Sequence, residues 1–380
     1  MIYLDNSATT KPYPEVVEAY IKVATEYFGN PSSVNALGSE AERLLYQSRE
    51  NISKLLSIHP SEIIFTSGGT EGNNMAIKGA ALKYKNRGKH IISTTIEHAS
   101  VQEALKQLEM HGYEVTYLPV DEKGAVTAQQ VKDAIRKETI LVTIIHVNNE
   151  VGTIQPIQKI GELLKDYPKI IFHVDDVQGI GKVPVNLSTS YIDLLTVSGH
   201  KFHSVKGTGF LYVRKGIKLE PLFTGGSQEN QLRAGTENVS GIVAMTKALR
   251  MSLENQSTKV TRLNQFKQTL ITFLNELGEI QVNTPIEGSA PHIVNFSIPG
   301  VKPEVMVHAL EEHNIYVSTK SACSSKQTSA SRILLEMGKP NRIAKHAIRV
   351  SLSSQNTEED IQAFCRAIKE IVTEKIVIKR

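Results

Sequence analysis

Short apolar runs alternate with longer amphipathic stretches between residues 62 and 214. The apolar runs indicate strands at 62–67, 90–95, 114–119, 140–147, 170–175, 192–198 and 209–214. The amphipathic stretches predict helices near 71–85, 100–111, 128–137 and 157–166. Strands that are apolar on both faces and alternate with helices are typical of βαβ units. We therefore expect a large α/β domain with a mainly parallel sheet covered on both sides.

The pattern changes after a long amphipathic segment at about 240–278. Beyond it we expect strands at 292–299, 315–319 and 347–353, with helices near 303–313 and 358–372. This mixture predicts a smaller α+β domain. The predicted division is a large domain of residues 15–255 and a small domain of residues 1–14 and 256–380, which carries Cys323.

The composition narrows the class of protein. The 380 residues carry a net charge of +4 with scattered basic residues, which disfavours nucleic-acid binding and favours small polar substrates or protein partners. Two cysteines, Cys323 and Cys365, are too few for a zinc site or a disulfide framework and indicate a reducing compartment. No stretch approaches ~20 apolar residues, and the first residues do not resemble a signal peptide. We expect a soluble cytoplasmic protein without membrane contact.

The segment FTSGGTEGNN places Gly68, Gly69 and Thr70 between a strand and a helix. Free N–H groups at a helix start, together with a Thr hydroxyl, can bind a phosphate. The alternative is a tight turn in which Thr70 only caps the helix. The segment fits neither of the usual glycine patterns for ATP or dinucleotides, so both ligands are disfavoured.

FHVDDVQ ends a buried strand with Asp175 and Asp176. A carboxylate at the carboxyl edge of a parallel sheet lies where ligands bind in open α/β folds. Its alternative role is structural, as the cap of a neighbouring helix. Metal binding by His173 and Asp175 is weakly supported because strand residues i and i+2 provide two ligands and no third is evident. No metal is expected.

SGHKF follows an apolar strand directly and contains Lys201. A lysine between an apolar approach and a glycine-rich turn can lose hydration, which lowers the pKa of its amine and suits imine formation. Most lysines at strand ends merely reach solvent. A phosphate cradle, a strand-end carboxylate and such a lysine together meet the requirements of pyridoxal 5'-phosphate.

The chain resembles the cysteine desulfurases, which are class V aminotransferases within the fold-type I pyridoxal phosphate enzymes. The resemblance covers nearly the whole chain and rests on the ordered motifs YLDNSATT, GNPSSVNALG, TSGGTEGNN, EHAS, HVNNEVGTIQPI, HVDDVQ, SGHKF, RAGTEN, SACSS and IRVSL. It implies a homodimer that converts L-cysteine to L-alanine. The sulfur would pass to an acceptor protein, for tRNA thiolation or iron–sulfur cluster assembly.

The resemblance also implies roles for individual residues around the cofactor. Lys201 would hold pyridoxal phosphate covalently and move protons, Asp175 would pair with the pyridinium nitrogen, and Gln178 would bind the ring hydroxyl. His98 would stack on the ring; taken alone, it fits equally a packed residue at a helix start. The phosphate would be held by several short polar groups, namely Gly69, Thr70, Ser198, His200 and, from a second subunit, Thr236.

The substrate side involves three residues by the same resemblance. Asn149 and Arg349 would bind the α-carboxylate, Arg349 with its planar fork, although in isolation Arg349 fits a surface ion pair. Cys323, as thiolate, would attack the substrate sulfur and carry it as a persulfide. It lies in VSTKSACSSKQTSASR, whose composition is that of a linker. A loop suits a nucleophile that must reach both the substrate and an acceptor.

Two positions depart from the family pattern. Asp176 stands where a small residue is common, and we expect its side chain to point to the opposite face of the strand from Asp175. Lys320 stands where glycine is usual, and a cation near Cys323 would lower the pKa of the thiol.

Other interpretations are open at this point. A selenocysteine lyase or an aminotransferase of the same fold would not need Cys323 for turnover. A non-catalytic sulfur-carrier scaffold would bind no cofactor, would be colourless, and its Lys201 and Asp175 would be structural. The chain ends soon after its last predicted helix, which favours a dedicated sulfur donor for tRNA thiolation over cluster assembly.

Overall fold

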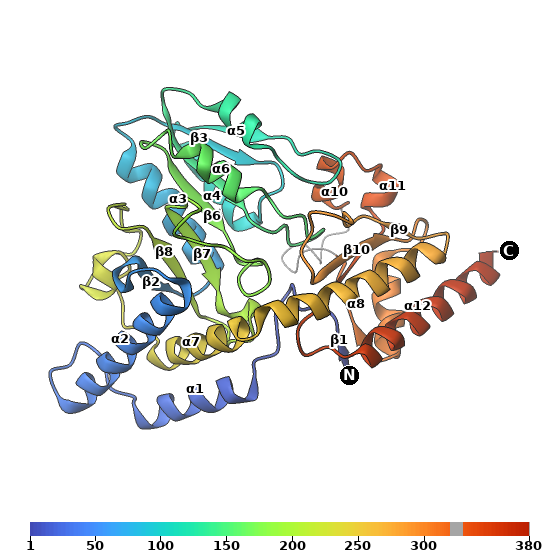
Figure 1. Cartoon of the computed structure of the whole chain (residues 1–380), viewed down its shortest axis with the longest axis horizontal. Helices are drawn as coiled ribbons and strands as arrows, with labels where there is room; N and C mark the ends of the chain where they lie inside the picture. The colour runs from blue at the N-terminus through green and yellow to red at the C-terminus, as the bar shows by residue number, and fades with distance from the viewer. Residues whose placement is uncertain (320–329, 380) are drawn as a thin grey trace.

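The computed structural model describes residues 1–319 and 330–379, with side chains described up to residue 373. Within this part of the chain, seven strands form the central sheet (Figure 1). They are β2 (Ile63–Thr66), β3 (His90–Thr94), β4 (Glu114–Leu118), β5 (Thr139–Ile145), β6 (Ile171–Asp175), β7 (Leu194–Ser198) and β8 (Gly209–Val213). The order is β2-β8-β7-β6-β5-β3-β4. The five strands β7, β6, β5, β3 and β4 are parallel to one another, and β8 is antiparallel to both of its neighbours. The expected mainly parallel sheet is confirmed.

Helices cover both faces of this sheet. They are α1 (Pro14–Glu26), α2 (Ala36–Leu56), α3 (Gly69–Tyr84), α4 (Ala99–Met110), α5 (Ala128–Ala134), α6 (Ile157–Leu164) and α7 (Val239–Leu253). Successive strand residues face opposite layers: Ile64 packs with α3 and α4, while Ile63 and Phe65 pack on the side of α6 and α7. Helix α5 is three residues shorter than expected because Ile135 adopts an extended conformation.

A second, smaller group of elements contains residues from both ends of the chain. A three-stranded antiparallel sheet has the order β12 (Ala347–Ser351), β10 (Ile293–Ser297), β9 (Gln281–Val282), and β1 (Ile2–Tyr3) pairs in parallel with β11 (Ile315–Tyr316). The helices are α8 (Gln256–Glu276), α9 (Pro303–Glu312), α10 (Arg332–Glu336), α11 (Asn341–Ala344) and α12 (Glu358–Lys379). Leu4 is buried with Leu270, Phe296 and Phe364 in a core separate from that of the large sheet. The predicted domain boundaries fit this arrangement and remain a prediction.

The long amphipathic segment at 240–278 is two helices rather than one. The break between α7 and α8 lies at Asn255, whose φ of 53° is left-handed. Asparagine is one of the few residues that adopt this conformation readily, so it interrupts the helical backbone and separates the two helices. Figure 1 shows α8 running from the large sheet toward α12.

Helix α3 begins two residues earlier than expected. Gly68 is its N-cap and has a φ of 146°, which glycine adopts without strain. Thr70 therefore lies in the first turn, and the interpretation of Thr70 as the N-cap is wrong. This start leaves the first N–H groups of the helix at the carboxyl edge of the sheet.

Candidate active site

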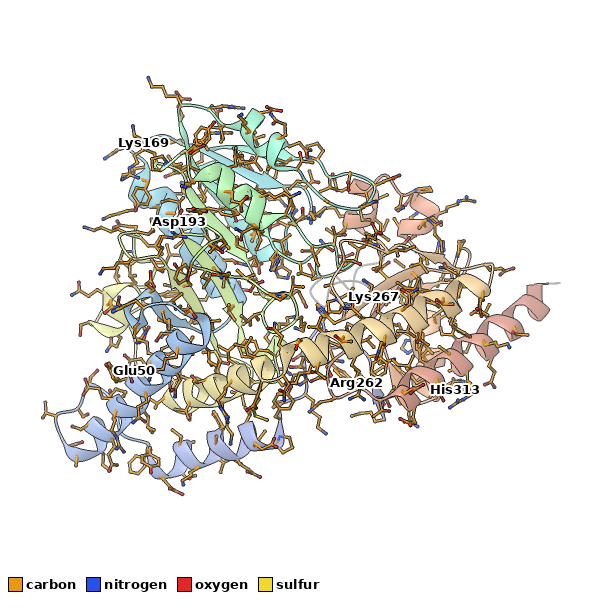
Figure 2. All side chains as sticks on the ribbon, in the orientation of Figure 1. Glu50, Lys169, Asp193, Arg262, Lys267 and His313 are labelled. Atoms are coloured by element: carbon orange, nitrogen blue, oxygen red, sulfur yellow. The ribbon has the colours of Figure 1, made fainter. Side chains whose placement is uncertain are left out.

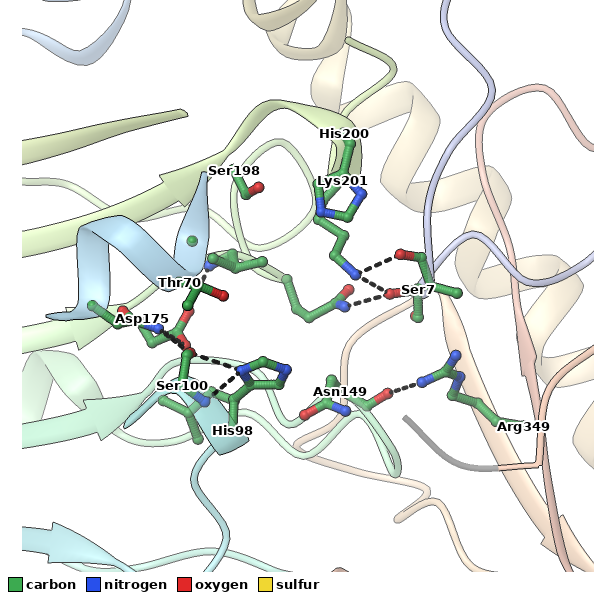
Figure 3. Close-up of a pocket in the computed structure, with 16 residues that line it drawn as sticks. Ser7, Thr70, His98, Ser100, Asn149, Asp175, Ser198, His200, Lys201 and Arg349 are labelled. Carbon is green, nitrogen blue, oxygen red and sulfur yellow. Dashed lines mark hydrogen bonds between the residues drawn. The ribbon is translucent and has the colours of Figure 1, made fainter. Parts of the chain in front are cut away.

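The carboxyl ends of β5, β6 and β7 border a cavity of about 250 Å³ (Figure 3). In open α/β sheets this edge is where ligands bind. Ten of the predicted site residues line it: Gly69, Thr70, His98, Asn149, Asp175, Gln178, Ser198, His200, Lys201 and Arg349. The structure thus brings together residues that are up to 280 positions apart in the chain.

Lys201 enters the cavity from η2 (Gly199–Lys201), a short 3-10 helix directly after β7. Its Nζ donates to the backbone carbonyl oxygens of Ser7 and Ala8, at 2.5 and 2.8 Å. Gln178 Nε2 donates to the same Ser7 oxygen at 2.9 Å. The N-terminal segment therefore forms a wall of the cavity and orients the lysine amine with main-chain groups.

Asp175 ends β6 and is buried. Asn73 Nδ2 donates to its Oδ2 at 2.8 Å, and the backbone N–H of Val177 donates to Oδ1 at 3.1 Å. The neighbouring Asp176 lies on the other side of the strand, where its Oδ1 is 2.6 Å from His146 Nδ1. The expected opposite orientation of the two carboxylates is confirmed, and Asp175 alone of the pair lines the cavity.

His98 caps the start of α4 and also lines the cavity. Its Nδ1 accepts from the backbone N–H of Ser100 at 3.2 Å and lies 2.8 Å from Ser100 Oγ. His98 therefore starts a helix and also lines the cavity, so its position at a helix start does not exclude a role in the site. These contacts fix the ring beside Asn73, whose amide also donates to Ser100 Oγ.

The other end of the cavity holds the groups predicted to bind phosphate. Gly69 and Thr70 form the first turn of α3, and Ser198 ends β7. Burial, with Lys201 and two other lysines nearby, lowers the pKa of His200 to about 3. His200 is therefore neutral at physiological pH and contributes hydrogen bonds rather than charge.

Arg349 lies in β12 and is only 1% exposed. Its Nη1 donates to the Asn149 carbonyl oxygen at 2.9 Å, and its Nη2 donates to Asp5 Oδ1 at 2.8 Å. Burial raises the pKa of Asp5, while the Arg349 cation opposes that shift. The alternative of a surface ion pair is wrong for Arg349.

Three buried polar atoms on the cavity lining have no hydrogen-bond partner: Ser7 Oγ, Asn73 Oδ1 and Arg349 Nε. Buried polar groups are normally satisfied, because leaving one without a partner costs about 1–3 kcal/mol. A polar ligand in the cavity would supply the missing partners. An amine, a carboxylate and a helix start that face one another fit pyridoxal phosphate with a bound amino acid.

Six lining residues were not predicted as site residues: Ser7, Ala8, Asn73, Ser100, Ile145 and Val177. All but Ile145 lie in a motif that the sequence already marked, namely YLDNSATT, TSGGTEGNN, EHAS or HVDDVQ. Helical periodicity would have found Asn73, because it is one turn after Gly69 and Thr70 on α3. Ser7 had no local signal, since a pairing over more than 300 residues brings its segment to the site.

One described residue among those predicted, Thr236, is not on the cavity lining. It borders a separate small cavity with Glu229 and Arg233, so its predicted contact with a second subunit's phosphate remains a prediction. Cys323 lies outside the described residues, as does Lys320.

His173 is a core residue rather than a metal ligand. Its Nδ1 is 2.8 Å from Thr143 Oγ1 and its Nε2 is 3.0 Å from Thr196 Oγ1. Among the residues that the structure describes, no three His, Cys, Asp or Glu side chains are grouped to hold a metal ion.

Burial lowers the pKa of His173 to about 3. The unfolded chain, with an ordinary pKa near 6.5, binds the proton first, so the contribution of His173 to stability falls as pH drops below 6.5. We expect His173→Gln, which keeps hydrogen-bonding groups between the two threonines, to flatten the pH dependence of unfolding between pH 6.5 and 4 by up to roughly 1 kcal/mol per unit. Denaturant titrations would measure this, with the exposed His308→Gln as control. An unchanged pH slope in His173→Gln would contradict the assignment.

Comparison with known proteins places these observations in a family. The family model for aminotransferase class-V matches residues 2–364. The chain is 46% identical to the NifS/IcsS protein homolog of Lactobacillus delbrueckii subsp. bulgaricus, over 98% of this chain and 97% of that protein. It is 43% identical to the cysteine desulfurase IscS of Dictyoglomus turgidum, over 98% and 94%. A solved NifS-like protein matches with a TM-score of 0.92 and 39% identity, over 98% and 99%.

Proposed function

The chain belongs to the aminotransferase class-V family and is a pyridoxal phosphate-dependent cysteine desulfurase; on this premise we propose that it moves sulfur from L-cysteine to Cys323 and then to an acceptor protein. The desulfurase relatives favour this reaction over the selenocysteine lyase, aminotransferase and carrier alternatives. The observation that carries the proposal is the position of Arg349, which faces the same cavity as Lys201 and pairs through its backbone with Ser318.

In the proposed site, Lys201 is the covalent attachment point of the cofactor and Asp175 is the partner of its ring nitrogen. Gln178 would bind the ring hydroxyl, and His98 would lie against the ring. The phosphate would be held by the groups at the opposite end, namely Gly69, Thr70, Ser198 and His200. When bound, pyridoxal phosphate supplies an electron sink for charge that develops at the substrate α-carbon.

Arg349 and Asn149 would bind the substrate α-carboxylate. The unpartnered Nε of Arg349 is a donor available to that carboxylate, and the guanidinium plane is already fixed by the Asn149 carbonyl and Asp5. An amino acid held in this way would lie in the cavity that Lys201 also lines. Lys201 would take the α-proton, and His98 would assist proton transfer.

Sulfur transfer would join the Cys323 thiolate to the sulfur of the substrate. The new S–S bond forms as the carbon–sulfur bond breaks, and its electron pair remains with the carbon, which gains a proton to give alanine. The balance is one cysteine and one thiol converted to one alanine and one persulfide. No external oxidant or reductant is needed.

The described residues on either side of the Cys323 segment support this role. Ser318 and Arg349 exchange two backbone hydrogen bonds, of 3.1 and 2.7 Å. Ser331 Oγ donates at 2.6 Å to Glu150, which follows Asn149, and Arg332 donates at 2.9 Å to the backbone oxygen of Glu97, which precedes His98. Both flanks of the segment are therefore bound to neighbours of the proposed substrate and cofactor residues.

The biological setting is also a proposal. We propose a homodimer in which Thr236 contributes to the phosphate site of the second subunit. Exposed apolar side chains such as Ile21, Phe28 and Val34 support a contact with another protein chain. No described helix has the length and apolar character that a membrane crossing requires. A thiol that must stay reduced supports a cytoplasmic location. The acceptor would be a protein of tRNA thiolation or of iron–sulfur cluster assembly.

Labelled sulfur tests the proposal and identifies the acceptor class. After incubation with ³⁵S-cysteine, we expect one alanine for each sulfur bound, with the label on the Cys323 peptide and sensitive to thiol reductants. Purified tRNA-thiolation and cluster-scaffold proteins are then added separately, with bovine albumin as control. Transfer to one of them only would identify the acceptor class. Alanine formed without any label on Cys323 would contradict the persulfide.

A further inference from the structure

Asp176 and His146 form a buried pair outside the cavity lining. Asp176 Oδ1 is 2.6 Å from His146 Nδ1, and the two side chains are 1% and 3% exposed. A Cβ on Gly179 would lie 2.0 Å from Asp176 Oδ1 and 2.4 Å from His146 Nδ1. Any other residue at 179 would break the pair apart, so the close approach of these two groups depends on glycine.

Lys182 connects this pair to Lys201. Its Nζ donates to the backbone carbonyl oxygen of Lys201 at 2.8 Å. Burial lowers the pKa of Lys182 to about 8, and the charge of Asp176 opposes that shift. Lys182 is therefore cationic at pH 7, and it loses its proton as the pH rises through about 8.

Asp176 is the acidic counter-charge for Lys182 in the described part of the chain. His200, His203 and His292 are buried near Lys182, and burial together with the charge of Lys182 lowers the pKa of each. Asp176 interacts with Asp175, His146 and Lys182, and burial raises the pKa of Asp176. Without His146 and Lys182, an ionised Asp176 next to Asp175 would raise the free energy of the folded state.

We propose that Lys182 is a positioning residue that fixes the main chain of Lys201, and that Asp176, linked to it through the backbone hydrogen bonds of Gly179, supplies its counter-charge. The Lys201 amine donates hydrogen bonds to the backbone oxygens of Ser7 and Ala8. The backbone carbonyl oxygen of Lys201 accepts a hydrogen bond from Lys182. A charged donor binds a carbonyl more strongly than a neutral one. This explains the second carboxylate at position 176, and it rests on the proposed role of Lys201 as the attachment point of the cofactor.

Cofactor loss from the intact holoenzyme tests the proposal without using activity. The rate is measured by dilution of the loaded protein into buffer with a trapping hydrazine, followed at the visible band of the cofactor. At pH 7 we expect Lys182→Met to lose cofactor about tenfold faster than the parent protein. At pH 9, where Lys182 is uncharged in the parent, the two rates should agree within about twofold.

Lys267→Met is the matched control. Lys267 lies on α8 (Figure 2), burial also lowers its pKa to about 8, and its Nζ donates to backbone oxygens of Ser289 and Ala290 rather than to the site. This variant should have its unfolding temperature lowered about as much as that of Lys182→Met, but it should lose cofactor at the rate of the parent protein. Equal rates for Lys182→Met and Lys267→Met at pH 7 would overturn the proposal.

Asp176→Asn provides an independent test if Lys182→Met does not fold. The amide keeps a polar contact with His146 and removes the charge, so the pKa of Lys182 falls. The alkaline increase in cofactor loss should then begin about one pH unit lower than in the parent. An unchanged onset would overturn the proposal. Borohydride reduction and peptide mapping of the parent check the premise: attachment at a residue other than Lys201 would refute the proposed function instead.

Discussion

Replacement of Lys201 by alanine is expected to lower the conversion of L-cysteine to alanine by about a thousandfold or more. Two functions are lost together, because Lys201 is the proposed attachment point and the group that takes the α-proton. The structure places its amine inside the cavity, within hydrogen-bond distance of Ser7 and Ala8. The other groups lining the cavity remain, so the variant should still bind pyridoxal phosphate, but without a covalent bond.

The measurement is alanine release together with the visible spectrum. Borohydride should fix cofactor to the parent protein and not to Lys201→Ala. Lys206→Ala is the control, since Lys206 is an exposed lysine five residues further along the same turn and does not line the cavity. A Lys201→Ala protein that still carries reducible cofactor, or turns over at the rate of Lys206→Ala, would contradict the assignment.

The sequence predicted the large sheet well because the signal was local. Strands such as β5 and β6 are apolar on both faces, as expected of strands covered by helices on both sides. The break between α7 and α8 was not predicted, because the amphipathic period continues across it and one left-handed residue, Asn255, interrupts the helical backbone. Such a break depends on packing that a pattern of apolar positions does not contain.

The site was predicted where its residues follow strands and was missed where they arrive from a distance. Asp175 is the last residue of β6 and Lys201 is the last residue of η2, which follows β7, so their position at the sheet edge follows from the topology. Asp5 and Ser7 reach the site because β1 pairs with β11, more than 300 residues away. The contact of Lys182 with Lys201 was also unforeseen, since no spacing rule brings a lysine to a backbone carbonyl 19 residues later.

The two cysteines of the chain are expected to behave in opposite ways, and this contrast is the sharpest test of the persulfide. Cys365 lies on α12 against the core of the smaller group, and burial raises the pKa of its thiol to about 11. At pH 8 almost none of it is thiolate, so it is a poor nucleophile. Cys365→Ala should therefore leave turnover within about twofold of the parent.

Cys323→Ala should lower multiple-turnover alanine formation by about a thousandfold or more, because the chain's other cysteine, Cys365, is half-buried and poorly ionised. Lys201 and Arg349 are untouched, so the variant should bind cofactor fully, and added L-cysteine should still change the visible spectrum. That combination separates sulfur acceptance from substrate binding, which a misfolded variant would lose at the same time. Alanine formation by Cys323→Ala at the rate of Cys365→Ala would mean that the sulfur leaves without an enzyme thiol, as in a lyase. The proposed persulfide route would then be wrong even though the fold and the cavity are those described.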